Sequence, residues 1–276
     1  MEKIKYVIFG VLMGVANVIP GVSGGTIAII LNFYDRLTES ITLNFRILKK
    51  NIGFLIPLFI GVLVGIVSLS KVMEYLLVNY TTETYFGFAG IVLGSLPLIF
   101  HKAKCEKISG VSFIPFVVTF MIMVFLSFVS VESTGPVTDY PLTILSGFKL
   151  FISMAVATVT MIIPGISGSM ILIIIGMYEV IYGYAIANFM IPLLIPIGLG
   201  AVFGLLGGAK LVNVLLHKYQ QLTYMAILGL LVGSFIELYN RSNLVFSFNE
   251  LLMPIIVALL MFIIVYWFSS YEINKK

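Results

Sequence analysis

One short string occurs twice in this chain and constrains every fold that the chain can adopt. The first copy, IPGVSGGT, covers residues 19–26, and the second, IPGISGSM, covers residues 163–170. Each copy interrupts an apolar stretch with Pro and Gly, which end a helix and permit a tight turn. An aromatic and an acidic residue follow each copy, Tyr34 with Asp35 and Tyr178 with Glu179. We interpret both strings as the tips of helical hairpins.

The two tips belong to a duplication that covers the whole chain. They align at an offset of 144 residues, and the segments after them align without a gap at an offset of 139. We therefore infer an internal repeat, with repeat 1 at residues 1–139 and repeat 2 at residues 140–276, in one integral membrane domain. The matches at the second offset include Pro57 with Pro196, Gly61 with Gly200, Gly65 with Gly204, Lys71 with Lys210, Tyr85 with Tyr224, Gly90 with Gly229 and Gly94 with Gly233.

Composition places the repeats in a membrane. Hydrophobic residues make up 60% of the chain and charged residues 10%, which leaves too little polar surface for a protein folded in water. We predict an all-α polytopic membrane protein in which each repeat is a hairpin plus three transmembrane helices. The predicted segments are hairpin 4–34 and spans 52–79, 84–100 and 111–131 in repeat 1, then hairpin 143–184 and spans 190–217, 223–239 and 251–270 in repeat 2.

An odd number of spans per repeat predicts that the two repeats have opposite orientations, as in many secondary transporters. The positive charges agree with this inverted repeat. If the N-terminus is inside, 13 of the 16 Lys and Arg residues lie inside, and only Lys71, Lys149 and Arg241 lie outside. We expect a multi-pass protein of the cytoplasmic membrane with both termini cytoplasmic.

The first hairpin should enter the membrane without crossing it. From Thr26 to Tyr34 a helix would be roughly 14 Å long, at about 1.5 Å per residue, against a hydrocarbon core of roughly 30 Å. The second hairpin has longer arms, so it can be either re-entrant or fully spanning.

Both tips have the chemistry of an anion site. The first amides of a helix have no partner within it, and a turn rich in Gly and hydroxyl groups lets an anion reach them. We therefore predict phosphate binding at the tips, although simple packing of broken helices through small residues is the alternative. The candidate residues are Ser23, Gly24, Gly25 and Thr26 in the first tip, Ser167, Gly168 and Ser169 in the second, and Asn17 just before the first.

The runs ANVIPGVSGGT with LNFYDRL and IPGISGSMILIIIGMYE resemble the hallmark strings of a prokaryotic membrane family. That family was formerly a domain of unknown function and is now described as polyprenyl-phosphate transporters, PopT in the case of undecaprenyl phosphate. The resemblance spans the chain and is most specific at the tips. It implies a flippase that returns the lipid carrier's phosphate head to the cytoplasmic leaflet for cell-envelope synthesis. The bilayer and this lipid are then the expected partners, and the isoprenoid tail can stay in lipid.

Charged residues near the tips are further candidates. Arg36 could bind the phosphate at the cytoplasmic end of the first hairpin, or it could be an interfacial arginine paired with Asp35. Lys71 and Lys210 occupy equivalent repeat positions and could flank the path, or extend to the interface. Proton coupling, if present, would fall on Glu179, Glu83, Glu74 or Glu237, and Glu179 is favoured because it is the repeat match of Asp35. Tyr34 and Tyr178 complete the candidate pathway.

Other functional classes are less consistent with the residues. The first tip matches G-x-S-x-G, but a serine nucleophile needs a neighbouring base, and we expect His101 and His217 to lie in cytoplasmic loops. The single Cys105 excludes a multi-cysteine metal site, and no cofactor is expected. The net charge of +4 is explained by loop lysines and not by nucleic-acid binding. An ion-coupled transporter of a small soluble anion stays open as the alternative, and so does a homo-oligomer.

Overall fold

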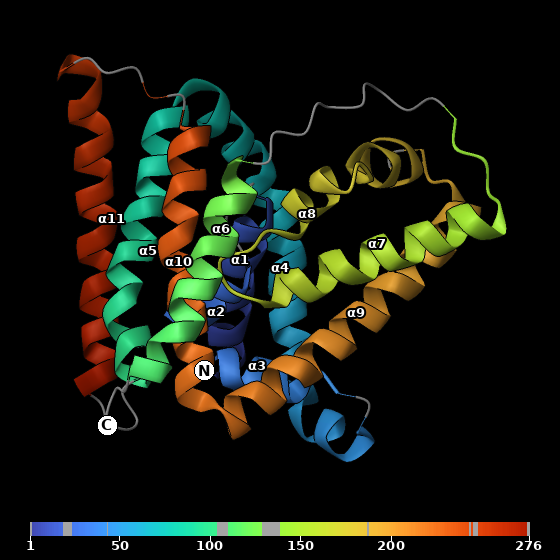
Figure 1. Cartoon of the computed structure of the whole chain (residues 1–276), viewed down its shortest axis with the longest axis horizontal. Coiled ribbons are helices and arrows are strands. Elements are labelled where there is room, and N and C mark those ends of the chain that lie inside the picture. The colour runs from blue at the N-terminus through green and yellow to red at the C-terminus, as the bar shows by residue number, and fades with distance from the viewer. Residues whose placement is uncertain are drawn as a thin grey trace.

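Helices are the regular elements of this computed structural model, which describes residues 2–18, 24–42, 44–103, 110–128, 139–186, 188–242, 244 and 248–274. The predicted all-α class is confirmed (Figure 1). In chain order the elements are α1 Glu2–Val18, α2 Gly24–Ile30, α3 Tyr34–Ser40, α4 Phe45–Asn79, α5 Thr81–Ala103, η1 Gly110–Phe113, α6 Ile114–Phe128, α7 Ile144–Ile162, α8 Gly168–Ile174, η2 Glu179–Ile186, α9 Ile191–Lys218, α10 Gln220–Arg241 and α11 Phe248–Asn274.

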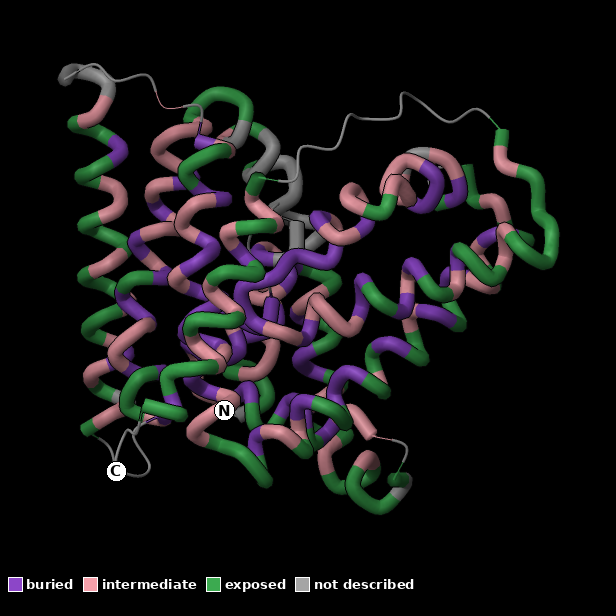
Figure 2. The backbone as a smooth tube through the Cα atoms, in the orientation of Figure 1, coloured by how far each residue is buried: buried purple, intermediate pink, exposed green. Residues whose placement is uncertain are grey.

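Seven of the described helices are long and apolar enough to cross a membrane: α4, α5, α6, α7, α9, α10 and α11. Their outer faces carry exposed apolar side chains, such as Phe125 with 70% and Trp267 with 71% of its surface accessible. Figure 2 shows exposed residues recurring along the length of α11. A surface of this kind suits lipid, because its apolar groups would be costly in water. The protein is therefore a multi-pass membrane protein.

Helix α4 begins earlier than the predicted span 52–79. Asn44 caps it, since its side-chain oxygen accepts a hydrogen bond from the Arg46 backbone N–H at 3.1 Å. The helix can therefore start in a polar segment before the apolar run begins. The start of α1 and the end of α11 lie at the same end of the molecule in Figure 1.

Long helices pack in pairs that follow the sequence repeat. In one set α1 packs on α4 and α7 packs on α9. In the other set the partners are exchanged between repeats, so that α5 packs on α11 and α10 packs on α6. The α7 and α9 pair extends obliquely away from the other long helices, to the right in Figure 1. The opposite membrane orientation of the two repeats stays a prediction.

Glycines that match between the repeats explain how these helices approach so closely. A Cβ atom placed on Gly61 would lie 2.1 Å from the Val7 carbonyl oxygen of α1. At the equivalent Gly200 it would lie 2.3 Å from the Phe151 carbonyl oxygen of α7. These are backbone contacts that cannot yield to a side-chain movement, so only Gly fits there. Such contacts through small residues hold helices together where lipid removes most of the hydrophobic driving force.

A pair of glycines on α9 permits a matched test of this packing. We expect Gly204→Ala to destabilise the protein by about 1–3 kcal/mol, because the added Cβ would lie 2.2 Å from the Ala155 carbonyl oxygen. Gly207→Ala, one turn away, meets no atom within 4 Å and should leave stability unchanged or slightly higher. Thermal unfolding of the detergent-purified variants measures both effects. Equal stability of the two variants would contradict the packing shown here.

The helix that follows each tip, which we call the return arm, ends in the same way in both hairpins, and the first one ends earlier than predicted. In the first arm Asn32 has a φ of 57°, and the Phe33 N–H donates to the Ala28 carbonyl at 2.9 Å. In the second arm Gly176 has a φ of 70°, and the Met177 N–H donates to the Leu172 carbonyl at 2.8 Å. This is the left-handed C-terminal cap that Asn and Gly adopt readily. The prediction of one helix from Thr26 to Tyr34 is therefore wrong.

Each return arm is thus a helix of seven residues, about 10 Å long at about 1.5 Å per residue. The second arm then bends by 109° between α8 and η2. Neither arm alone is long enough to cross a bilayer core of roughly 30 Å. Re-entry of the two hairpins from opposite sides stays a prediction.

Candidate functional site

The two hairpin tips meet in the interior of the molecule. Thr26, in the first turn of α2, is 2% exposed, and its Oγ1 accepts a hydrogen bond from the Gly165 backbone N–H at 3.2 Å. Gly165 has a φ of 91° and lies against Leu230 of α10, a backbone conformation and a space that suit glycine. Residues 139 positions apart in the sequence are therefore joined by a buried polar contact.

Hydroxyl groups gather at the second tip. Ser167 precedes α8 and is buried, and its Oγ lies 2.7 Å from the Ser169 Oγ. Gly168 packs closely on α7, since a Cβ there would lie 2.6 Å from the Ala157 carbonyl oxygen. Gly24 and Gly25 of the first tip are buried in α2. Ser23 and the side chain of Asn17 lie outside the described residues, so their predicted roles stay predictions.

Tyr34 links the first hairpin to the second. It is fully buried at the start of α3, and its hydroxyl donates to the Ile162 carbonyl, the last residue of α7, at 2.9 Å. Its repeat equivalent Tyr178 is half-buried and packs on Tyr182, with ring centroids 5.1 Å apart. Glu179 begins η2 and is also half-buried. The two hairpins therefore have different surroundings at equivalent positions.

Asp35 is held by two residues that sequence reasoning did not assign to it. Lys102 of α5 places its Nζ 3.3 Å from one carboxylate oxygen, and the Tyr224 hydroxyl of α10 donates to the other at 2.8 Å. The Lys102 side chain is 10% exposed and that of Asp35 is 50% exposed. This three-residue group, which we call the inner cluster, ties α3 to α5 and α10.

The alternative interpretation of Arg36 as the partner of Asp35 is wrong. The Arg36 guanidinium carbon lies 5.1 Å from the centre of the Tyr6 ring and 4.6 Å from the centre of the Phe54 ring. An Nη atom also donates to the Tyr6 hydroxyl. Consecutive residues of a helix point in different directions, so neighbours in the sequence do not face each other. The aromatic rings fix the guanidinium without neutralising it.

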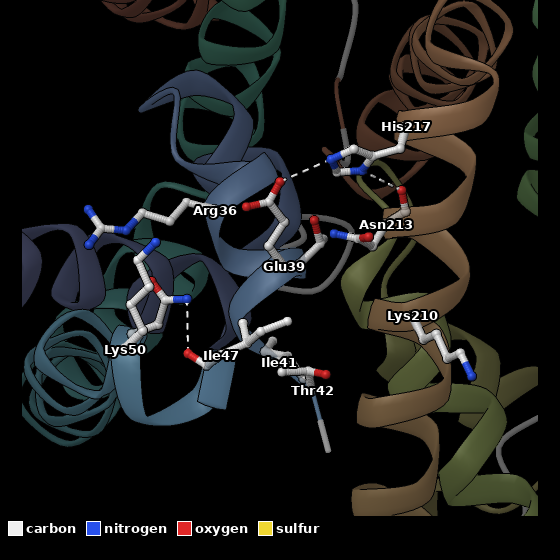
Figure 3. A pocket seen from close by; sticks show the side chains of 11 residues that line it. Arg36, Glu39, Ile41, Thr42, Ile47, Lys50, Lys210, Asn213 and His217 are labelled. Atoms are coloured by element: carbon white, nitrogen blue, oxygen red, sulfur yellow. Dashed lines mark hydrogen bonds and ion pairs between the residues drawn. The ribbon is translucent and has the colours of Figure 1, made fainter. Parts of the chain in front are cut away.

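Arg36 lines a polar cavity of about 640 Å³ between α3, α4 and α9 (Figure 3). Lys210 also lines it, although the two side chains extend in opposite directions in this view. Glu39 and His217 face each other across it, with the His217 Nε2 3.2 Å from the Glu39 carboxylate. Lys71 lies within α4, and its side chain is outside the described residues. The other lining residues are Thr38, Ile41, Thr42, Ile47, Lys50, Asn51 and Asn213.

The cavity can attract an anion. Arg36, Lys50 and Lys210 bring three positive charges to its lining, and Glu39 brings one negative charge. Amide and hydroxyl groups from Asn51, Asn213 and Thr42 add hydrogen-bonding capacity. The expectation that His101 and His217 lie in loops is wrong, because they occupy the last turns of α5 and α9.

Sequence reasoning missed several of these residues. Lys102 and Lys50 were counted only among the positive charges on the inside, His217 was considered only as a possible catalytic base, and Tyr224 was noted only as a match in the repeat. The repeat carried a usable signal, since it singled out Tyr85 and Tyr224 as equivalent polar groups within apolar helices.

Comparison with known proteins agrees with these features. The model of the undecaprenyl phosphate translocase-like family matches residues 13–250. The chain belongs to this family. A polyprenyl-phosphate transporter of Vibrio cholerae serotype O1 is 32% identical over 255 residues, which cover 85% of this chain and 77% of that protein. A polyprenyl-phosphate transporter of Staphylococcus aureus is 31% identical over 269 residues, which cover 93% and 94% of the two chains. No solved structure matches the chain significantly.

Membership of the undecaprenyl phosphate translocase-like family supports the resemblance stated from the hairpin strings. The match from residue 13 to residue 250 includes both tips, the inner cluster and the residues that line the cavity. The two relatives are named as transporters, which supports transport of a lipid carrier.

Proposed function

We propose that this protein is a flippase that moves polyprenyl phosphate, including undecaprenyl phosphate, across the cytoplasmic membrane and returns it to the cytoplasmic leaflet. The observation that carries the proposal is the buried contact between the two hairpin tips, from Thr26 to Gly165. Polar groups are costly inside a membrane protein and mark substrate paths. The two relatives named as polyprenyl-phosphate transporters supply the substrate class.

On its way to the cytoplasmic leaflet, the phosphate leaves through the cavity lined by Arg36, Lys50 and Lys210. A phosphate monoester carries about −1.5 to −2 charges near neutral pH and cannot enter hydrocarbon unless cations and dipoles replace its water. Arg36 suits this role because its guanidinium is held on two aromatic rings and presents a planar fork of donors.

Helix α3 connects the cavity to the tips. Tyr34 at its start binds the end of α7 beside the second tip, and Arg36, two residues later, lines the cavity. The phosphate reaches this cavity from the tips, where Thr26, Ser167 and Ser169 supply hydroxyl groups, together with Ser23, Gly24, Gly25 and Gly168. The isoprenoid tail stays in the bilayer throughout. No catalytic step, metal or cofactor takes part, and both termini lie in the cytoplasm.

The test is a flip assay with the purified protein in liposomes that carry fluorescent polyprenyl phosphate. A membrane-impermeant quencher measures the fraction of lipid in each leaflet over time. We expect the protein to accelerate exchange of the phosphate lipid, and to leave a matched neutral polyprenol and a phosphodiester lipid unchanged. Uptake of a soluble anion without any lipid exchange would contradict the proposal and favour the soluble-anion transporter.

A further inference from the structure

A second acid, tyrosine and cation group lies at the other end of α10 from the inner cluster. Glu237 is 4% exposed, and one of its carboxylate oxygens accepts a hydrogen bond from the Arg241 Nε at 3.0 Å. Tyr85 of α5 lies close enough to Arg241 and Glu237 for both charges to act on its hydroxyl group. We call these three residues the outer cluster. The proposed phosphate path does not yet include them.

The outer cluster has an incomplete hydrogen-bond set. The second carboxylate oxygen of Glu237, Oε2, is buried and has no hydrogen-bond partner among the described residues. A buried carboxylate oxygen without a donor is costly, so its site favours the arrival of a proton or of another donor.

The outer cluster is related to the inner cluster by the repeat. The offset of 139 that pairs Tyr85 with Tyr224 also pairs Lys102 with Arg241. At the inner end, Lys102 and Tyr224 together bind a carboxylate, that of Asp35, at 3.3 and 2.8 Å. The equivalent pair, Arg241 and Tyr85, lies at the other end of α10, and there Arg241 binds the carboxylate of Glu237.

The two clusters lie on opposite sides of the first hairpin tip. Tyr224 and Glu237 are 13 residues apart on α10, about 20 Å at about 1.5 Å per residue. Tyr85 belongs to a buried cluster with Ala16 and the neighbouring Ile27, which flank the first tip on α1 and α2. A phosphate that moves inward therefore meets the outer cluster before it reaches the tips and the cavity.

Binding of phosphate to Arg241 conflicts with an ionised Glu237. Two anions within hydrogen-bond distance of one guanidinium repel each other, and one of them is neutralised most simply by a proton. Among the side chains that the structure describes, the charged and titratable groups that face Glu237 are Arg241 from its own helix and Tyr85 from α5. The unpaired Oε2 is the atom that accepts such a proton without breaking the hydrogen bond to Oε1.

We propose that Arg241 and Tyr85 form a second binding site for a phosphate monoester, and that Glu237 takes up a proton at Oε2 when the phosphate binds. This inference rests on the proposed function, for which it supplies the outer phosphate site and the coupling ion. Because linkage is reciprocal, a proton on Glu237 strengthens phosphate binding to the same degree that phosphate strengthens proton binding. A proton gradient across the membrane, with the more acidic side outside, then drives the lipid inward, because the proton and the phosphate bind together at the outer cluster.

The proposal is tested by measuring proton uptake during ligand binding. The full-length protein in detergent and weak buffer is titrated with farnesyl phosphate, a short-chain polyprenyl phosphate, and a pH indicator follows the protons. We expect wild type to take up about one proton more per bound ligand than Glu237→Gln, which mimics the neutral acid and keeps the binding site. Arg241→Gln should weaken binding at least tenfold. Asp139→Asn, at an exposed carboxylate outside the clusters, is the matched control and should behave as wild type.

Equal proton uptake by wild type and Glu237→Gln would overturn the assignment of the proton to Glu237. Unchanged binding by both Arg241→Gln and Tyr85→Phe would overturn the phosphate site. A parallel titration with inorganic phosphate separates the two possible sources of the phosphate group. If inorganic phosphate gives the full effect and the wild type does not exchange polyprenyl phosphate in liposomes, the outer site stands and the proposed lipid function fails. If lipid exchange is normal and no variant differs from wild type, the function stands and this inference fails.

Discussion

Replacing Thr26 by valine is expected to slow polyprenyl-phosphate exchange about tenfold. The substitution keeps the shape of the side chain but removes the only oxygen that it offers to the Gly165 N–H. A buried donor left without its partner costs about 1–3 kcal/mol, and a cost of about 1.4 kcal/mol corresponds to a tenfold change. We expect the substitution to destabilise the conformation in which the two tips meet. The liposome flip assay measures the resulting fall in the exchange rate.

Thr158→Val is the control for this prediction. Thr158 is also a buried threonine, but its hydroxyl donates to the Met154 carbonyl of its own helix at 2.7 Å. Its removal leaves that carbonyl in its helical hydrogen bond, so exchange should stay within about twofold of wild type. If Thr26→Val and Thr158→Val exchange lipid equally fast, the tip contact has no role in transport.

The class of the protein could be predicted from its sequence because hydropathy alone decides it. An all-helical protein is the expected outcome for long apolar runs in lipid, since a helix satisfies all of its own backbone groups. The repeat also singled out the correct packing positions, because Gly61, Gly65 and their equivalents Gly200 and Gly204 all touch the backbone of a neighbouring helix. Only glycine fits such contacts, so the pattern is visible in one sequence.

The partners of those positions could not be predicted in the same way. Nothing local in the sequence says that α5 packs on α11 of the other repeat, or that α10 packs on α6. For the same reason Asp35 seemed to belong to its neighbour Arg36, whereas the fold brings Lys102, 67 residues away, to its carboxylate. Contacts between distant segments depend on the whole packing arrangement and leave little trace in local spacing.

The end of each return arm is a different case, because the residue types that mark this helix end are present in the sequence and were overlooked. Asn32 and Gly176 are equivalent at the offset of 144, and both residue types favour the left-handed conformation that ends a helix. Their positions predict two arms of equal length. Tyr34 and Tyr178 then start new helical segments, which is how Tyr34 reaches the end of α7.

Arg36→Gln should lower lipid exchange by about 10- to 150-fold, the largest effect that we expect at the cavity. A hydrogen bond from a charged group to a phosphate is worth about 1.5–3 kcal/mol, and glutamine keeps the length of the side chain but loses the charge. Arg36→Lys should recover only part of the rate. Its point charge cannot reproduce the planar packing on the rings of Tyr6 and Phe54, which lie 5.1 and 4.6 Å from the guanidinium carbon.

Arg46→Gln is the matched control for Arg36. Arg46 is an exposed arginine in the first turn of α4 and is not among the residues that line the cavity. If the cations act only through the general surface charge, both substitutions should slow exchange equally, and both effects should disappear as added salt screens the charges. A loss confined to Arg36→Gln is the result expected of a guanidinium that binds the phosphate directly, because Arg46 carries the same charge but does not line the cavity.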